Sequence, residues 1–120
     1  MKLKEKESDI QKAILDYLRL KKIFCFRSNC GAMPGEYKGK PWFVRFGMPG
    51  VSDIIGILTL NNLGVILCVE VKSLKGKQSD AQKEFQEKIQ SAGGLYILAK
   101  SIDDVVYGIQ EFKKKFIWKQ

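Results

Sequence analysis

The sequence predicts a single α/β domain in which helices flank a central mixed β-sheet. The chain has 120 residues, which suits one domain, and 45% hydrophobic with 28% charged residues is typical of a globular protein. Segments with the 3.6-residue periodicity of helices alternate with short apolar segments typical of strands, in the order α-β-β-β-β-α-β-α. No repeat or linker divides the chain, so we expect one domain over residues 1–120.

The first part of the chain is predicted to hold a helix, a strand and a long loop. A helical apolar stripe runs through residues 7–22 and consists of Ile10, Ile14, Tyr17 and Leu18. Residues 23–28 are apolar enough for a strand. Residues 29–41 contain three glycines and two prolines, so we expect a long loop, which in a compact domain is usually functional or disordered.

The middle of the chain is predicted to be a β-hairpin that follows a short strand and a turn. Residues 42–46 favour the strand, and residues 48–51 fit a type II turn with Pro and Gly at its centre. Two apolar strands then flank the sequence "NNLG", which is predicted to be the hairpin turn. Two registers are open, one with Leu60 opposite Val65 and one with Leu60 opposite Leu63.

The last part is predicted to be a helix, a strand and a helix. The first of these helices starts at the cap residue Ser79 and ends at Gly93 and Gly94. The strand covers residues 95–99, and the final helix covers residues 102–116.

The charge and the residue types restrict the possible functions. The net charge is +8, from 21 basic and 13 acidic residues, which favours a polyanionic partner such as nucleic acid over a merely basic protein. The chain has no histidine, which excludes His-ligated zinc, a Ser-His-Asp triad and a histidine general base. Any chemistry must therefore use carboxylates, lysine and hydroxyls, alone or together with a hard metal ion.

The sequence also indicates a compartment. It contains no apolar run long enough to span a membrane and no apolar signal core at its N-terminus, so we expect a cytoplasmic protein without membrane contacts. The three cysteines, Cys25, Cys30 and Cys68, have no CxxC spacing, which favours reduced thiols.

Both hairpin registers place three charged residues on one face of the sheet. Side chains alternate along a strand, so Asp53, Glu70 and Lys72 share a face at one end of the hairpin unless a bulge intervenes. Such neighbours lie roughly 5–8 Å apart at Cβ, which lets two carboxylates converge on one cation. These carboxylates are the only acids in residues 37–79, which also contain Lys38, Lys40, Arg45, Lys72, Lys75 and Lys77. This pattern suits metal-assisted phosphodiester cleavage, whereas Glu-x-Lys alone is more often an ion pair.

With Asp53 upstream of Glu70 and Lys72, the pattern resembles the PD-(D/E)xK nuclease superfamily and, more narrowly, its VRR-NUC (virus-type replication-repair nuclease) family. The resemblance covers nearly the whole chain: Glu7 with Gln11, then "GVSDIIGI", "VEVKSLKGKQSDAQKEF" and "GG" before an apolar strand. Ser52 stands where the superfamily has a proline, which departs from the motif but keeps the acid. The resemblance implies a restriction-endonuclease-like fold.

The resemblance also implies a mechanism and partners. It implies a Mg²⁺ or Mn²⁺ site whose ligands are Asp53, Glu70, Glu7 and the backbone carbonyl of Val71. Lys72 would orient or activate the attacking water, Gln82 would support the site, and no small-molecule cofactor is needed. The substrate would be DNA, branched or in a four-way junction. Stand-alone members of this size resemble phage-type homodimers, which would act in the cytoplasm of the bacterial host.

Several of these residues have a simpler interpretation. Glu7 also fits a solvated acid in a first helical turn, and Ser79-x-x-Gln82 also fits a capping box. Six basic residues are candidates for nucleic-acid contacts, although loop lysines are often only solvated: Lys75, Lys77, Arg45, Arg27, Lys38 and Lys40. The C-terminal "FKKKFIWKQ" could bind DNA, but we expect its aromatic residues to pack.

Two functions from other classes compete with the nuclease. One is a catalytically inactive DNA-binding module that retains the fold, and the other is an RNA-binding accessory protein. Neither would show metal-dependent cleavage.

Overall fold

The structure, a computed structural model, describes residues 6–28, 31–37 and 40–118, of which 31–37, 40–46 and 117–118 are described by their backbone alone. Within these residues, three helices and six strands follow one another in the order α-β-β-β-β-β-α-β-α. They are α1 (Glu7–Leu20), β1 (Phe24–Arg27), β2 (Gly31–Tyr37), β3 (Lys40–Phe46), β4 (Ile54–Leu60), β5 (Leu63–Val71), α2 (Asp80–Ser91), β6 (Leu95–Ala99) and α3 (Ile102–Trp118).

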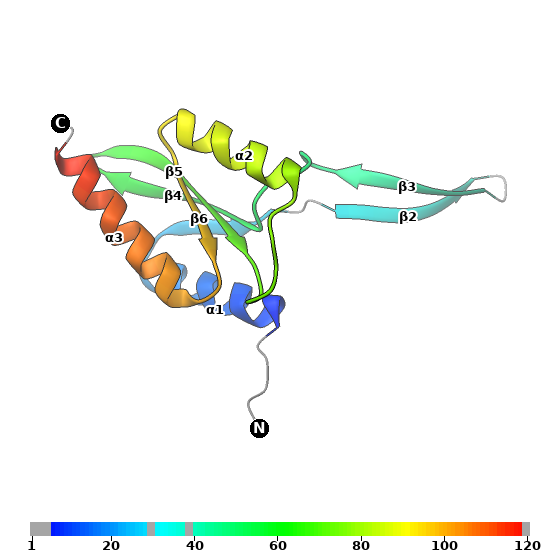
Figure 1. The fold of residues 1–120 in the computed structure, drawn as a ribbon, viewed down its shortest axis with the longest axis horizontal. Helices are drawn as coiled ribbons and strands as arrows, with labels where there is room; N and C mark the ends of the chain where they lie inside the picture. The colour runs from blue at the N-terminus through cyan, green and yellow to red at the C-terminus, as the bar shows by residue number, and fades with distance from the viewer. Residues whose placement is uncertain (1–5, 29–30, 38–39, 119–120) are drawn as a thin grey trace, which may run out of the picture.

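The central sheet has four strands in the order β1-β4-β5-β6 (Figure 1). β4 pairs antiparallel with both β1 and β5, whereas β5 and β6 run parallel, so the sheet is mixed as predicted. The parallel pair requires a crossover, and α2 provides it. The α/β class predicted from the sequence is therefore confirmed.

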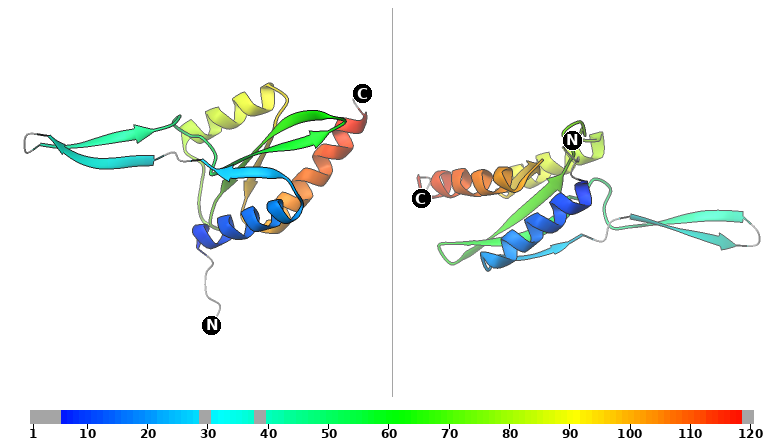
Figure 2. Two further views of the ribbon diagram at one scale, coloured as in Figure 1. Left: turned by 180° about the vertical axis from the view of Figure 1, so that it is seen from behind. Right: turned by 90° about the horizontal axis from the view of Figure 1, so that it is seen from below.

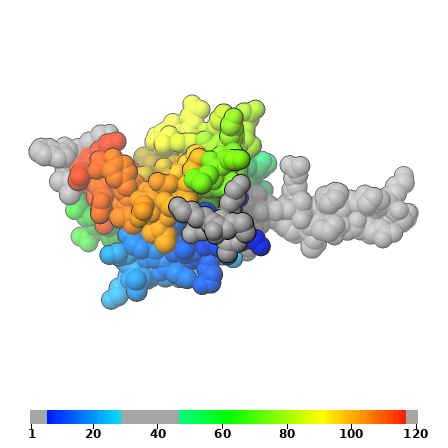
Figure 3. All heavy atoms as spheres, turned by 60° about the horizontal axis from the view of Figure 1, so that its bottom comes forward, coloured from blue at the N-terminus to red at the C-terminus, as the bar shows by residue number. Residues whose placement is uncertain are grey.

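Different helices cover the two faces of this sheet. On one face α1 and α3 lie side by side (Figure 3), and their residues Ile14, Leu18 and Val105 are fully buried against Leu67 and Val69 of β5. None of the helices in the described part of the chain is both long and apolar enough to cross a membrane.

The opposite face is covered by α2 beside β5 and β6. Phe85 of α2 packs there with Cys68 and Tyr96. Cys25 and Cys68 are buried free thiols, and desolvation raises the pKa of both, while Cys30 lies outside the described residues. Burial and the raised pKa both disfavour the reactive thiolate at these two positions.

β2 and β3 form a separate antiparallel ribbon, which extends away from the central sheet as an arm (Figures 1 and 2). The pairing runs from Gly31 opposite Phe46 to Tyr37 opposite Lys40. The predicted loop over residues 29–41 was therefore wrong where the chain is described. Its glycines and prolines were interpreted as strand breakers, but both strands of a ribbon are edge strands, which tolerate a residue without an N–H.

Two tight turns fix the hairpin of β4 and β5 and its entry. Asn61 and Asn62 have φ of 49° and 64°, as a two-residue type I′ turn requires, so Leu60 pairs with Leu63. The register with Leu60 opposite Val65 was wrong. At residues 48–51, the Val51 N–H donates to the Met48 carbonyl at 3.2 Å and Gly50 has φ of 81°, which confirms the predicted type II turn.

The remaining predicted elements are confirmed to within about two residues at each end. The largest differences are two residues each: α1 ends at Leu20, β3 begins at Lys40, and α3 continues to Trp118. The helices, the central strands and β3 therefore follow from local patterns, whereas β2 does not.

Candidate active site

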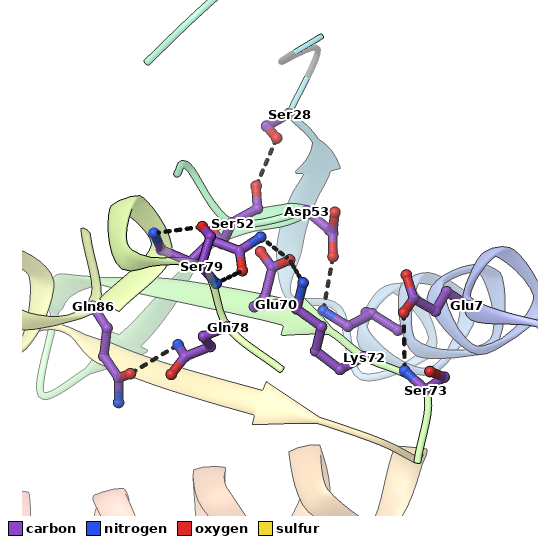
Figure 4. Close-up of polar contacts among 12 residues, drawn as sticks. Glu7, Ser28, Ser52, Asp53, Glu70, Lys72, Ser73, Gln78, Ser79 and Gln86 are labelled. Atoms are coloured by element: carbon purple, nitrogen blue, oxygen red, sulfur yellow. Dashed lines mark hydrogen bonds and ion pairs between the residues drawn. The ribbon is translucent and has the colours of Figure 1, made fainter. Parts of the chain in front are cut away.

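The site lies at one end of the central sheet, where the N-termini of α1 and α2 approach the start of β4 and the end of β5 (Figure 4). Asp53 directly precedes β4, and Glu70 is the second-last residue of β5. The pairing of Ile54 with Val69, continued by one residue, sets Asp53 opposite Glu70. Both side chains are therefore on the face of the sheet that α2 covers.

The backbone around Asp53 is held by two serines. The Ser28 N–H donates to the Asp53 carbonyl at 2.9 Å, and the Ser28 hydroxyl donates to the Ser52 carbonyl at 2.6 Å. Ser52 is fully buried, and its hydroxyl donates to the Ile54 carbonyl at 3.1 Å. Asp53 Oδ2 accepts from the Val71 N–H at 2.8 Å, so the carboxylate continues the pairing between the strands.

Glu70 is the buried carboxylate of the site. Its Oε1 accepts from Gln82 Nε2 at 3.0 Å and lies 3.7 Å from Lys72 Nζ, and its side chain is only 4% exposed. Its Oε2 is buried and, among the described residues, has no hydrogen-bond partner. Burial and then the Asp53 carboxylate raise the pKa of Glu70 to about 8, while the Lys72 ammonium opposes the shift. A cation beside Oε2 would remove both penalties.

Gln82 fulfils both of the roles that the sequence left open. Its Oε1 accepts from the Ser79 N–H at 2.9 Å while Ser79 Oγ accepts from the Gln82 N–H at 3.2 Å, which is a complete capping box. Because the amide oxygen faces the helix cap, the amide nitrogen faces Glu70. The first turn of α2 thereby orients the buried carboxylate.

Glu7 lies beside this group without joining it. It is exposed at the start of α1, and its Oε1 accepts from the Ser73 N–H at 3.0 Å. Among the described residues, no three His, Cys, Asp or Glu side chains come close enough together to hold a metal ion. The structure therefore brings together two carboxylates, with Lys72 and Gln82, and places the third acid at the neighbouring loop.

The candidate nucleic-acid contacts are only partly described. Arg27, Lys75 and Lys77 are exposed, the first at the end of β1 and the other two in the loop between β5 and α2. The side chains of Lys40 and Arg45, and the whole of Lys38, lie outside the described residues.

Sequence reasoning missed Ser28. A serine that follows a strand carries no periodicity or motif that connects it to an aspartate farther along the chain. Only the pairing of Arg27 with Ile54 brings Ser28 to the Asp53 backbone. From the sequence, Ser52 was noted only because it stands where the superfamily has a proline. In the structure its buried hydroxyl hydrogen-bonds to the Ile54 carbonyl.

The donors fit a hard divalent cation. The Asp53 and Glu70 carboxylates and the Val71 carbonyl all offer oxygen, which Mg²⁺ prefers, and Glu70 Oε2 is left without a partner among the described residues. Glu70, Asp53 and Lys72 therefore form a group suited to hydrolysis at a phosphate.

The fold and the site define a small α/β protein with a carboxylate pair and a lysine at one end of its sheet. The family model described as the VRR-NUC domain matches residues 5–103 of the 120. Since this match spans most of the chain, the protein belongs to the VRR-NUC family, which indicates a nuclease-type function and DNA as the substrate. The comparisons with curated proteins and with solved structures found no match.

Proposed function

We propose that the protein is a divalent-metal-dependent endonuclease that hydrolyses phosphodiester bonds in DNA. The observation that carries the proposal is the buried Glu70, whose Oε2 has no partner among the described residues and whose pKa is raised to about 8 beside Asp53. Burying such a group costs stability, and a site that binds a cation accounts for that cost.

Each side chain has a role that its geometry supports. Asp53, Glu70 and the Val71 carbonyl would hold Mg²⁺ or Mn²⁺, which supplies Lewis-acid stabilisation of the charge that develops on the scissile phosphate. The Lys72 side chain is 15% exposed, so its ammonium can reach both Glu70 and solvent, where it would position the attacking water. Gln82 fixes the Glu70 carboxylate, and Glu7 would contact the ion through water.

The proposed substrate is branched DNA, such as a four-way junction, and the proposed setting is a bacterial cell infected by a phage that encodes the protein. Membership of the family and the net charge of +8 support this choice. Resolution of a junction requires two symmetric cuts, and a two-fold homodimer presents two identical sites.

A catalytically inactive DNA- or RNA-binding module with the same fold is the second candidate. The observation that favours it is that only two carboxylates come together in the described part of the chain. It would bind nucleic acid without cutting.

A cleavage assay over duplex, nicked, flap, splayed and four-way DNA separates the two candidates. We expect cutting in Mg²⁺ or Mn²⁺ and none in chelator, with branched DNA cut fastest. Lys72→Ala should reduce the rate by about 10²–10⁴, because one positioned catalytic group is lost. Lys113→Ala, an exposed lysine of α3 on the other face of the sheet, is the matched control. Absence of cutting on all five DNAs, or a Lys72→Ala rate within about tenfold of the parent, would contradict the nuclease.

A further inference from the structure

The loop between β5 and α2 presents a leucine to solvent beside the site. Leu74 follows Lys72 by two residues and is 82% exposed, the largest fraction among the large apolar residues that the structure describes. Because consecutive Cα atoms are about 3.8 Å apart, the Cα atoms of Leu74 and Lys72 are at most about 8 Å from each other. A single exposed leucine is ordinary on a protein surface, so its surroundings decide whether it has a role.

The backbone that carries Leu74 is a tight turn that Ser73 and Gly76 close. The Gly76 N–H donates to the Ser73 carbonyl at 3.0 Å, so Leu74 and Lys75 occupy the two central positions of the turn. A Cβ on Gly76 would lie only 3.4 Å from the Cβ and the Cδ of Lys72, so the turn rests on that side chain. The position of Leu74 is therefore tied to the position of Lys72.

Three further hydrogen bonds hold this turn to other parts of the fold. The Lys72 N–H donates to the carbonyl of the last residue of β6 at 2.9 Å. The Ser73 N–H donates to Glu7 Oε1, at the start of α1, at 3.0 Å (Figure 4). Lys100 Nζ donates to the Leu74 carbonyl at 3.0 Å. The backbone of Leu74 is thus fixed, whereas most of the residue is left in solvent.

The charges around Leu74 indicate which partner the turn would meet. Lys75 stands next to it in the turn, Lys77 is exposed in the same loop, and the Lys100 ammonium reaches the turn as well. Such cations attract the phosphates of a nucleic acid. Leucine is one of the apolar residues that DNA-binding proteins insert between base pairs, and a fixed backbone lowers the entropic cost of that contact.

We propose that Leu74 inserts between adjacent base pairs at a branch in DNA and thereby selects branched DNA for the site. Insertion requires the flanking bases to unstack, which costs less where a branch already interrupts the stack than in a continuous duplex. Lys75 and Lys77 would hold the DNA backbone while Leu74 enters. This inference rests on the nuclease proposed above, and it names the residue that distinguishes branched from continuous DNA.

The test measures binding in chelator, so its result does not depend on cleavage. A four-way junction and a linear duplex of the same sequence carry 2-aminopurine, whose fluorescence rises when it unstacks, at successive positions from the branch. We expect the parent protein at saturation to raise the fluorescence beside the branch and to leave that of the duplex unchanged.

Leu74→Ala should abolish this rise in fluorescence. It should also lower the affinity for the junction by about tenfold, because burial of one leucine side chain is worth at least about that factor. The affinity for the duplex comes mainly from the lysines and should not change. The preference of the protein for the junction over the duplex should therefore fall by the same factor.

Three other variants serve as controls. Leu20→Ala is the matched one, because Leu20 is 80% exposed at the end of α1, about 20 Å from Glu7, and it should behave as the parent does. Leu74→Met keeps an apolar side chain in the turn and should retain the rise. Leu74→Gln keeps a side chain of similar size without the apolar surface and should lose it. Circular dichroism checks that each variant is folded.

Four results would overturn the proposal. The first is a parent that leaves the fluorescence beside the branch unchanged, and the second is a folded Leu74→Ala that matches the parent. The third is an equal loss of affinity for junction and duplex, which would make Leu74 a support for the lysines. The fourth is a Leu74→Ala protein with a different mass in sedimentation, which would place Leu74 against a second copy of the chain.

The same experiment separates this inference from the proposed nuclease. Cutting by the parent in Mg²⁺ without any rise in fluorescence would refute the insertion and leave the nuclease standing. A rise that depends on Leu74, in a protein that does not cut, would refute the nuclease alone.

Discussion

Glu70 is a carboxylate whose environment disfavours its charged form. It is buried and faces Asp53, and among the described residues Lys72 provides the compensating charge. A side chain in this state makes the protein's stability depend on pH, and the binding of the proposed cation would add to that stability.

The first prediction concerns this pH dependence in chelator. The pKa of Glu70 rises from 4.5 to about 8 on folding, so the folded chain holds the proton more tightly than the unfolded chain. The contribution of Glu70 to stability is therefore full below about pH 4.5 and is lost as the pH rises toward about 8. Glu70→Gln should remove this decline, as measured by urea unfolding across that range. If the free energy of unfolding changed equally with pH in the parent and the variant, the pKa of Glu70 would not be raised by folding.

The second prediction concerns the charge of Asp53. Asp53→Asn keeps an oxygen that can accept from the Val71 N–H, so the fold should be preserved. The variant should lose cleavage, because a proposed metal ligand is weakened. In chelator its DNA affinity should equal or exceed that of the parent, since a negative charge near the phosphate is removed.

Filter binding or fluorescence anisotropy in chelator measures this affinity. Asp80→Asn, an acid of the first turn of α2 outside the carboxylate pair, is the control for a general change of charge. If Asp53→Asn weakened metal-free binding tenfold while remaining folded, Asp53 would organise the DNA contact and the metal-site interpretation would be wrong.

At the scale of the elements, the turn at residues 48–51 connects the arm to the site. Gly50 has φ of 81°, and a Cβ on it would clash with the carbonyl oxygen of Ala81 in the first turn of α2. The turn that precedes Asp53 is therefore packed directly on the helix that carries Gln82. The close packing of this turn on α2 therefore requires glycine at position 50.

The third prediction compares two glycines. Gly93 also has a left-handed φ, of 92°, but no described heavy atom lies within 4 Å of a Cβ built there. Gly93→Ala should thus cost about 1 kcal/mol of stability, from backbone strain alone. Gly50→Ala should cost about 1–3 kcal/mol more, because the clash adds to the strain, and it should also lower activity. Denaturant unfolding of both variants checks this, and equal losses would show that the turn does not press on α2.

How much of this molecule is predictable from its sequence differs between elements. The hairpin of β4 and β5 follows from its apolar strands, and the alternation of side chains is enough to place Asp53 with Glu70 in either register. Residues 42–46 of β3 were predicted as a strand, but β2 was missed because the glycines and prolines of residues 31–41 suppress any strand signal, while pairing between two edges tolerates them. From the sequence, Gln82 could either cap α2 or support the site. In the structure it does both, because its amide oxygen accepts from the Ser79 N–H and its amide nitrogen donates to Glu70.

At the scale of the whole molecule, the net positive charge determines how strongly the affinity for DNA depends on salt. The excess of basic residues should make binding fall steeply with salt, by about 10³–10⁵ between 50 and 200 mM for six to ten phosphate contacts. Exposed Lys75 and Lys77 lie in the loop next to the site, so we expect both among these contacts.

The fourth prediction tests this loop. Lys75→Gln with Lys77→Gln should lower the slope of log affinity against log salt by about two, because each lysine contributes about one. Lys113→Gln with Lys115→Gln removes the same charge from α3, behind the sheet, and should leave the slope unchanged. Affinity in chelator at several salt concentrations measures both. Equal slopes for the two double variants would show that the loop carries no phosphate contacts.

The turn at Asn61 and Asn62 also limits which insertions and deletions the hairpin of β4 and β5 can accept. The turn lies at the far end of the hairpin, about 20 Å from Asp53, yet it sets which residue of β4 faces which residue of β5. An insertion of one residue that the turn did not absorb would exchange the two faces of β4 and turn Asp53 toward α1 and α3. A substitution in the turn must therefore be a residue that tolerates a positive φ, such as Gly or Asp, and the turn must also keep its length of two residues.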